Sequence, residues 1–125
     1  MELALVIDLG GTNIKYGLCS KLGKLVYESS QKTEAHLGKV YVLKKILSIS
    51  EETLLIAAKM GKTVCGIGLG SPGMVDITHH QLVGHGTNIK DWHTIHFKSE
   101  IGDQLKLPLY AENDANLAAL GEACY

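Results

Sequence analysis

Two short apolar runs near the start of the chain, separated by an acidic and glycine-containing turn, decide how the fold must begin. Residues 3–7 are aliphatic or β-branched, as in a buried strand, and Asp8 stands at the end of this run. Residues 14–18 then alternate with the period of a second strand. Because Gly10 and Gly11 can adopt the positive φ angles of a tight turn, the stretch predicts a β-hairpin.

A third strand is expected before any helix. Residues 20–24 form a polar turn, and the first half of residues 25–33 is rich in strand-forming side chains. Three consecutive strands exclude a simple alternation of strands and helices. An amphipathic helix is then predicted over residues 37–60, with Gly61 as its C-terminal cap. The apolar side chains that give this helix its period are Val40, Leu43, Leu47, Leu54 and Ala58.

The second half of the chain predicts shorter elements. These are a buried strand within residues 63–73, short strands and loop over 74–92, a helix over 93–107, a strand over 108–112 and a helix over 113–125. The helix over 93–107 is predicted despite Gly102, and Pro108 ends it. The resulting order, β-β-β-α-β-α-β-α, is that of an α/β fold with a mixed sheet.

The composition is that of an ordinary globular protein. Hydrophobic residues make up 46% and charged residues 20% of the chain, and the formal net charge of -1 favours neither nucleic acid nor an acidic membrane as partner. The sequence shows neither a signal segment nor an apolar run long enough for a membrane span. Cys19 and Cys65 lie in apolar runs outside any CxxC pair, which predicts buried free thiols. The sequence therefore predicts a soluble, cytoplasmic protein.

The first candidate site is the turn of the opening hairpin. Gly10 and Gly11 allow backbone N–H groups to approach an anion, and Thr12 adds a hydroxyl. Asp8 is suited to hold Mg²⁺ through water, and Asn13 completes the polar turn. A hairpin turn without a ligand explains the same residues.

The second candidate is a loop after the strand within residues 63–73. Its "GLGSPG" matches a dinucleotide-binding fingerprint, but that fingerprint must open a helix, and the residues after Gly73 have no helical apolar face. A rigid Ser71-Pro72-Gly73 loop at the end of a strand is the better interpretation. Pockets in open α/β sheets commonly form at such strand ends.

The third candidate is the polar run that follows the strand over 108–112. Asn113 or Asp114 would cap the next helix, but one cap does not require Glu112, Asn113 and Asp114 in succession. A carboxylate at this junction is suited to accept a proton from a substrate hydroxyl. Asn88 is suited either to a polar ligand role or to a structural turn.

Four motifs together resemble one known family. "DLGGTNIKYGL", "GLGSPGMVD", "TNIKDW" and "ENDANLAALGE" occur in the order and at the spacing seen in the ROK family of sugar kinases and related repressors. The resemblance covers the whole chain. It implies a ribonuclease H-like lobe of the actin-like ATPase and hexokinase superfamily, and it implies ATP and Mg²⁺ as cofactors.

The resemblance also implies roles for individual residues. Asp114 is similar to the base that deprotonates the sugar hydroxyl, and Asn88 and Asn113 are similar to ligands of the sugar. The remaining implied assignments are Ser71, Pro72 and Gly73 in the wall of the sugar pocket, Glu112 beside the substrate, Asp8, Gly10, Gly11, Thr12 and Asn13 at the ATP phosphates, and Asp8 as the residue nearest Mg²⁺.

The chain departs from the family by the lobe that it does not contain. Family members carry a second lobe with the adenosine pocket, further sugar ligands and a zinc-binding cysteine cluster. Residues 1–125 thus resemble an N-terminal lobe alone, with the C-terminal lobe and its structural zinc missing. We expect this piece to turn over poorly by itself and to associate with itself through exposed apolar surface.

Three functions are compatible with this resemblance. The first is ATP-dependent phosphorylation of a hexose or an N-acetylhexosamine, and the second is a sugar-sensing transcriptional regulator. Regulators of the family usually place a DNA-binding segment before the "GGT" motif, whereas the first strand here begins at Leu3 and no basic face is evident. The third is a non-catalytic sugar-binding module, against which the presence of both Asp8 and Asp114 counts.

Overall fold

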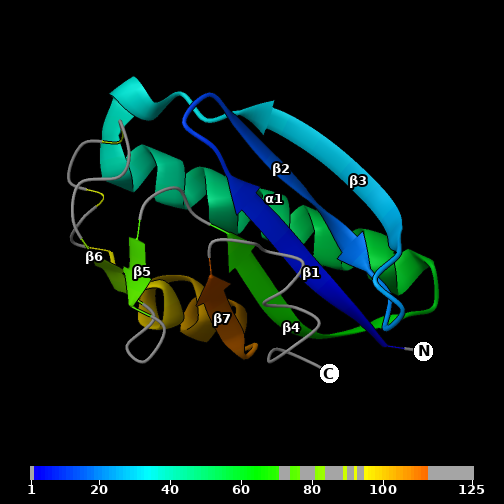
Figure 1. The fold of residues 1–125 in the computed structure, drawn as a ribbon. Helices are drawn as coiled ribbons and strands as arrows, with labels where there is room; N and C mark the ends of the chain where they lie inside the picture. Colours follow the sequence, from blue (N-terminus) through cyan, green and yellow to red (C-terminus); the bar gives the residue numbers. More distant parts are fainter. Residues whose placement is uncertain are drawn as a thin grey trace.

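A five-stranded mixed sheet with the strand order β3-β2-β1-β4-β7 forms the centre of the computed structural model (Figure 1). The structure describes residues 2–70, 74–76, 81–83, 89, 92 and 95–112. The strands of the sheet are β1 (Glu2–Leu9), β2 (Asn13–Cys19), β3 (Leu25–Lys32), β4 (Thr63–Gly70) and β7 (Leu109–Glu112). β1, β2 and β3 pair antiparallel, whereas β4 runs parallel to both β1 and β7. The predicted α/β fold with a mixed sheet is confirmed.

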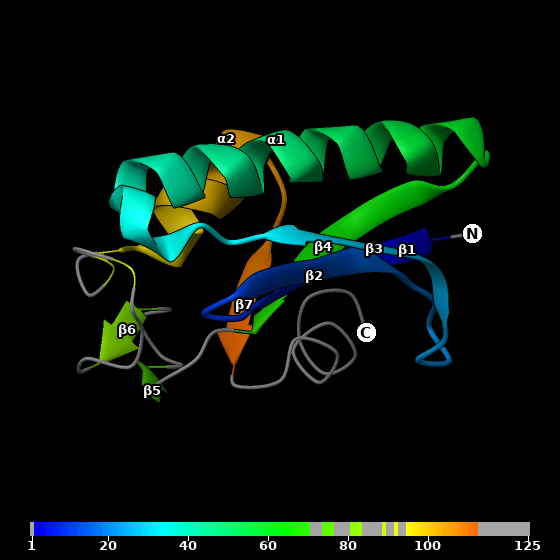
Figure 2. The same ribbon diagram turned by 90° about the horizontal axis from the view of Figure 1, so that it is seen from above.

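One face of the sheet is covered by helical segments (Figure 2). The 3₁₀ turn η1 (Ala35–Leu37) leads into the long helix α1 (Gly38–Lys59), which confirms the helix predicted over residues 37–60. Met60 caps α1, and Gly61 follows with φ at 72°. Gly61 therefore has the left-handed conformation that commonly ends a helix.

The predicted buried side of α1 is wrong. Val40 is 65% exposed and Ala58 is exposed, while Leu43, Leu47 and Leu54 are only half-buried. The buried residues of the helix are Val42, Ile46, Ile49, Ser50, Thr53 and Ala57. Ser50 and Thr53 tolerate burial because their hydroxyls donate to the carbonyls of the preceding turn, each at 2.7 Å. A period counted only from apolar side chains passes over these two positions.

The helix predicted over residues 93–107 is shorter in the structure. It comprises the π-helical turn η3 (Lys98–Gly102) and the short α2 (Asp103–Leu105), and Lys106 ends it with φ at 58°. Space at Gly102 is tight, because a Cβ atom on it would lie 3.0 Å from Leu109 Cβ and 3.1 Å from the Leu107 oxygen. The same glycine that counts against a helix thus permits close packing onto β7.

The connection between β4 and η3 contains two short strands, β5 (Met74–Asp76) and β6 (Gln81–Val83), where short strands were predicted, and these two strands pair antiparallel. The predicted loop at residues 71–73 and the predicted helix over 113–125 lie outside the described residues.

The hydrophobic core lies between the sheet and its helical layer. Ile7 of β1, Leu69 of β4 and Ile46 of α1 are fully buried there. Trp92 and Phe97 are buried in the same core, with their ring centroids 6.0 Å apart. Such aromatic pairs contribute beyond the area that they bury, by about 0.5–1.5 kcal/mol. Among the described helices, none combines the length and the apolar character needed to cross a membrane.

The cysteines differ from one another. Cys19 is a buried free thiol, as predicted, and its burial raises its pKa. Cys65 is half-buried and disulfide-bonded, so the prediction of a free thiol at this position is wrong. Apolar neighbours in a strand indicate burial, but they do not reveal whether a second cysteine comes within bonding distance.

Candidate functional site

The carboxyl ends of three neighbouring strands bring two acidic candidates to the same edge of the sheet. Asp8 of β1 pairs with Gly70 of β4, and Gly70 pairs with Glu112 of β7. Since adjacent strands lie about 4.8 Å apart, the Cα atoms of Asp8 and Glu112 are about 10 Å apart. Gly70 has no side chain to fill the space between them.

Both acidic residues lie on the sheet face opposite α1. Their neighbours along the strands, Ile7 and Ala111, pack into the core on the α1 side, and successive side chains of a strand point to opposite faces. Asp8 is exposed and Glu112 is half-buried. The alternation of each strand thus directs both carboxylates away from the core, at the carboxyl edge of the sheet.

Residues 10–13, which we call the glycine turn, join β1 to β2 at this edge. The Gly10 N–H donates to the Asn13 carbonyl at 2.9 Å and closes the turn. A Cβ atom on Gly10 would lie 2.7 Å from that carbonyl oxygen, so the turn requires glycine there for space. The expected positive φ angles are not used, because the described glycines with positive φ are Gly23, Gly38 and Gly61.

The glycine turn presents backbone donors to solvent. Gly11, Thr12 and Asn13 are exposed. Among the described residues, no acceptor is within hydrogen-bonding distance of the N–H groups of Gly11 or Thr12. Successive N–H groups of this kind form the concave donor sets that bind phosphate. The anion site predicted at this turn depends on these exposed donors and stays a prediction.

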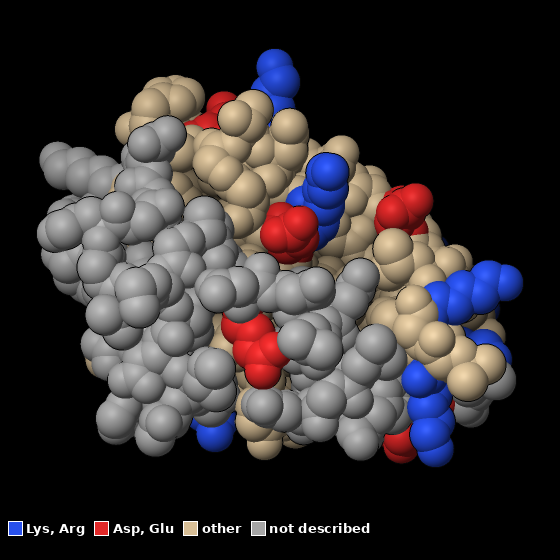
Figure 3. Space-filling view, in the orientation of Figure 1, with Lys and Arg blue, Asp and Glu red and all other residues tan. Residues whose placement is uncertain are grey.

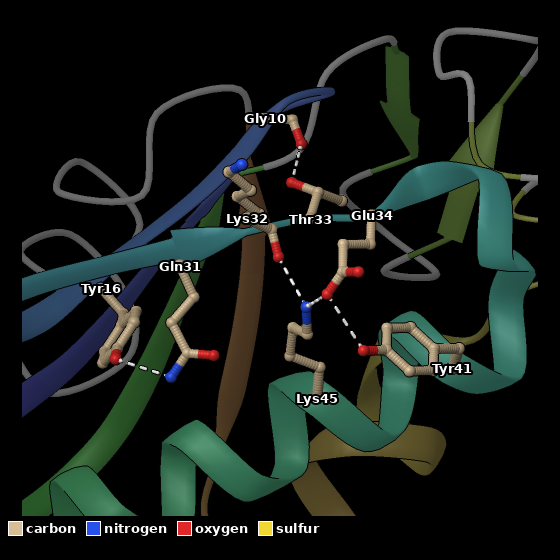
Figure 4. A network of polar contacts seen from close by, with 8 residues as sticks. All are labelled: Gly10, Tyr16, Gln31, Lys32, Thr33, Glu34, Tyr41 and Lys45. Carbon is tan, nitrogen blue, oxygen red and sulfur yellow. Dashed lines mark hydrogen bonds and ion pairs between the residues drawn. The ribbon is translucent and has the colours of Figure 1, made fainter.

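Thr33 supports the glycine turn from below and was not a candidate in the sequence. It follows β3 directly and is fully buried. Its hydroxyl donates to the Gly10 carbonyl at 2.7 Å (Figure 4). Its N–H donates to the Thr12 carbonyl at 2.9 Å. The pairing of β2 with β3 places Thr33 beside the turn, but a sequence without known strand register does not show this.

The segment around Thr33 is fastened to α1 by Lys45. Its ammonium donates to the Lys32 carbonyl at 2.7 Å and to the Glu34 carboxylate at 2.6 Å, so it holds the chain on both sides of Thr33 (Figure 4). Tyr41 donates to the same carboxylate at 3.0 Å. The hydrogen bonds from Lys45 and Tyr41 hold the pKa of Glu34 below its usual value. Glu34 itself has φ at 55°, a backbone conformation that residues other than glycine rarely adopt.

The other candidates lie outside the described residues. They are Ser71, Pro72, Gly73, Asn88, Asn113 and Asp114. In the described ranges, no three His, Cys, Asp or Glu side chains come close enough together to hold a metal ion directly. The approach of Mg²⁺ to Asp8 through water therefore stays a prediction.

The charges on the surface of the chain are mixed. On the face shown in Figure 3, the described lysines are scattered among acidic side chains and do not form a continuous patch. The described residues on this face therefore do not form the concentrated positive charge that nucleic-acid binding relies on.

The arrangement of strands and helices identifies the fold. A β-hairpin with a third strand, a long helix and two parallel strands form part of the actin-like ATPase fold found in sugar kinases. A glucokinase of Streptomyces griseus, solved with glucose and AMPPNP, matches with a TM-score of 0.72 at 23% identity, over 95% of this chain and 37% of that one. This likeness shows the fold.

The sequence then defines the family. The ROK family profile matches residues 4–125, so the chain belongs to the ROK family. A glucokinase of Thermotoga maritima is 34% identical over 116 residues, which are 93% of this chain and 35% of that protein. A putative xylose repressor of Caldicellulosiruptor is 31% identical over 120 residues, 96% of this chain and 30% of that protein. The chain thus spans about a third of the length of these relatives.

Proposed function

We propose that this chain supplies the phosphate-binding turn and the catalytic base of an ATP-dependent kinase acting on a hexose or N-acetylhexosamine hydroxyl. The observation that carries the proposal is the edge of the sheet where β1 and β7 end. There the glycine turn, with its exposed N–H groups, shares one edge with Glu112, two residues before Asp114. The similarity to glucokinases supports the same assignment.

The donor side of the reaction is assigned to the glycine turn. Phosphoryl transfer depends mainly on positioning and on the neutralisation of charge. ATP with Mg²⁺ supplies the transferable phosphoryl group and part of that neutralisation. The N–H groups of Gly11 and Thr12 fit phosphate oxygens because they are exposed and have no other described acceptor. Asp8, exposed at the end of β1, is assigned to the water shell of the metal ion.

The acceptor side is assigned to the residues after β7. Asp114 takes the proton from the attacking sugar hydroxyl, and Asn113 and Asn88 bind neighbouring hydroxyls. Ser71-Pro72-Gly73 forms part of the pocket wall, and Glu112 lies beside the substrate. β4 ends at Gly70, next to Glu112, which supports a common pocket for the segments that follow both strands.

We assign residues 1–125 to the N-terminal lobe of the kinase. Relatives of about three times the length support this assignment. The adenosine pocket and a structural zinc site then belong to the C-terminal lobe, and the isolated chain lacks turnover. The kinase is proposed to work in the cytoplasm, where ATP is supplied, and to form homo-oligomers. Because Cys65 is disulfide-bonded, a free thiol at this position no longer supports the assignment to the cytoplasm.

A panel of sugars tests the activity. ADP release is measured with hexoses and N-acetylhexosamines, using the chain together with any coding sequence that flanks it in its gene. Turnover with at least one sugar is the expected result. Sugar binding without turnover would reject the kinase and favour a sugar-responsive regulator, a candidate supported by the similarity to a putative xylose repressor. Gel-shift measurements with and without that sugar would then identify the regulator.

A further inference from the structure

Thr33 makes two contacts that together determine how the glycine turn presents its donors. Its hydroxyl donates to the carbonyl of Gly10 at 2.7 Å. Its N–H binds the Thr12 carbonyl at 2.9 Å. The carbonyls of Gly10 and Thr12, the residues on either side of Gly11, therefore both point toward Thr33.

The planarity of the peptide bond converts these contacts into donor directions. The described peptide bonds are all trans, so the carbonyl of one residue and the N–H of the next point in opposite directions. With the Gly10 carbonyl held by Thr33, the N–H of Gly11 points away from Thr33. With the Thr12 carbonyl held in the same way, the N–H of Asn13 also points away from it.

We propose that Thr33 is a positioning residue that orients the N–H groups of Gly11 and Asn13, within the glycine turn, toward a bound polyphosphate. The identity of that anion as the ATP phosphates rests on the proposed function. The orientation itself rests on the two hydrogen bonds of Thr33 and on the planarity of the peptide. A donor set that is fixed before binding costs less conformational entropy when the anion arrives.

The position of Thr33 is itself determined by α1. Lys45 binds the carbonyl of Lys32 and the carboxylate of Glu34, the residues on either side of Thr33. The Lys45 side chain is 13% exposed, whereas the Glu34 side chain that it binds is 38% exposed. The order of contacts therefore runs from α1 through Lys45 to the neighbours of Thr33, and from Thr33 to the glycine turn, with no direct contact needed between Lys45 and the anion.

Affinity for inorganic tripolyphosphate with Mg²⁺ tests the proposal without requiring sugar chemistry. Calorimetric titrations use the chain with any flanking coding sequence, as wild type, Thr33→Val and Thr33→Ser. Loss of a buried hydroxyl partner leaves the Gly10 carbonyl without its donor, so Thr33→Val should weaken binding by about tenfold. Thr33→Ser keeps the hydroxyl and should stay within about twofold of wild type. Steady-state kinetics should show the same ratio in KM for ATP and an unchanged KM for sugar.

Thr53→Val is the matched control. Thr53 is also fully buried, and its hydroxyl donates to a carbonyl at the same distance of 2.7 Å, but within α1. Its loss should change stability without changing tripolyphosphate affinity. Wild-type affinity in Thr33→Val would overturn the proposal. Equal weakening in Thr33→Val, Thr33→Ser and Thr53→Val would overturn it too, because that pattern follows general destabilisation.

If Thr33→Val does not fold, a second variant tests the proposal in its place. Lys45→Met removes the two contacts around Thr33 and leaves the glycine turn intact, and it should weaken tripolyphosphate binding severalfold. Unchanged affinity in Lys45→Met would then refute the proposal. A wild-type protein that binds tripolyphosphate but phosphorylates no sugar would contradict only the proposed function. A wild-type protein that binds no tripolyphosphate would contradict both.

Discussion

Replacing Gly10 with alanine should damage the glycine turn by direct overlap. The new Cβ atom would lie 2.7 Å from the Asn13 carbonyl oxygen, whereas carbon and oxygen atoms in close contact are about 3.3 Å apart. The carbonyl must therefore move by about 0.6 Å. It is the same carbonyl that accepts the Gly10 N–H at 2.9 Å, so the bond that closes the turn is strained or lost.

The expected cost has two parts. Overpacking costs about 1–3 kcal/mol, and a lost backbone hydrogen bond adds about 1 kcal/mol. The free energy of unfolding, measured by urea denaturation, should fall by about 2–4 kcal/mol. The KM for ATP should rise at least tenfold in the folded fraction, because the displaced turn no longer aims its donors at the phosphates.

Gly61→Ala is the control for this prediction. Gly61 has φ at 72° and open space around its Cα, so alanine there costs about 1–2 kcal/mol through backbone strain alone. Because Gly61 lies at the end of α1, this variant should lose stability without a change in KM for ATP. Gly10→Ala with wild-type stability and wild-type KM would refute the geometry of the turn.

Two further predictions concern the helix side of the structure. Ile46→Ala, at a fully buried position of α1, should lower the free energy of unfolding by about 2–5 kcal/mol, whereas Val40→Ala should change it by less than about 0.5 kcal/mol. Equal losses in urea denaturation would show that the orientation of α1 is wrong. The folded-state pKa of Glu34 is lowered, so its contribution to stability is present above its ordinary pKa of 4.5 and is lost as the pH falls through the folded value. The stability difference between wild type and Glu34→Gln should therefore shrink from pH 7 to pH 3, and a constant difference would contradict the ion pair with Lys45.

The opening of the chain was predictable because its signals are local. Apolar runs on both sides of Gly10 and Gly11 can form only a hairpin, and the structure has one. The conformation of the turn was less predictable, since glycine is used at position 10 for space and not for a positive φ. Space depends on the neighbouring atoms, which a propensity argument does not include.

The buried side of α1 and the role of Thr33 depend on contacts that are distant in sequence. Their polar character makes Ser50 and Thr53 appear solvent-facing in the sequence. They are buried because their hydroxyls donate to backbone carbonyls of the helix. Thr33 contacts Gly10 across 23 positions, and only the register of β2 with β3 brings them together. No local pattern in the sequence marks such a residue, and its position directly after a strand does not by itself indicate which turn it contacts.

The assignment of Asp114 as the base of a sugar kinase can be tested by comparing three forms of the protein. Turnover number and sugar affinity are measured for wild type, Asp114→Asn and Glu112→Gln, using the chain with any flanking coding sequence. Asp114→Asn is expected to lower kcat by about 10²–10⁴ while the Kd for sugar changes only severalfold. Glu112→Gln should alter sugar affinity and leave kcat within about tenfold of wild type. A kcat for Asp114→Asn close to that of wild type would contradict the assignment of Asp114 as the base.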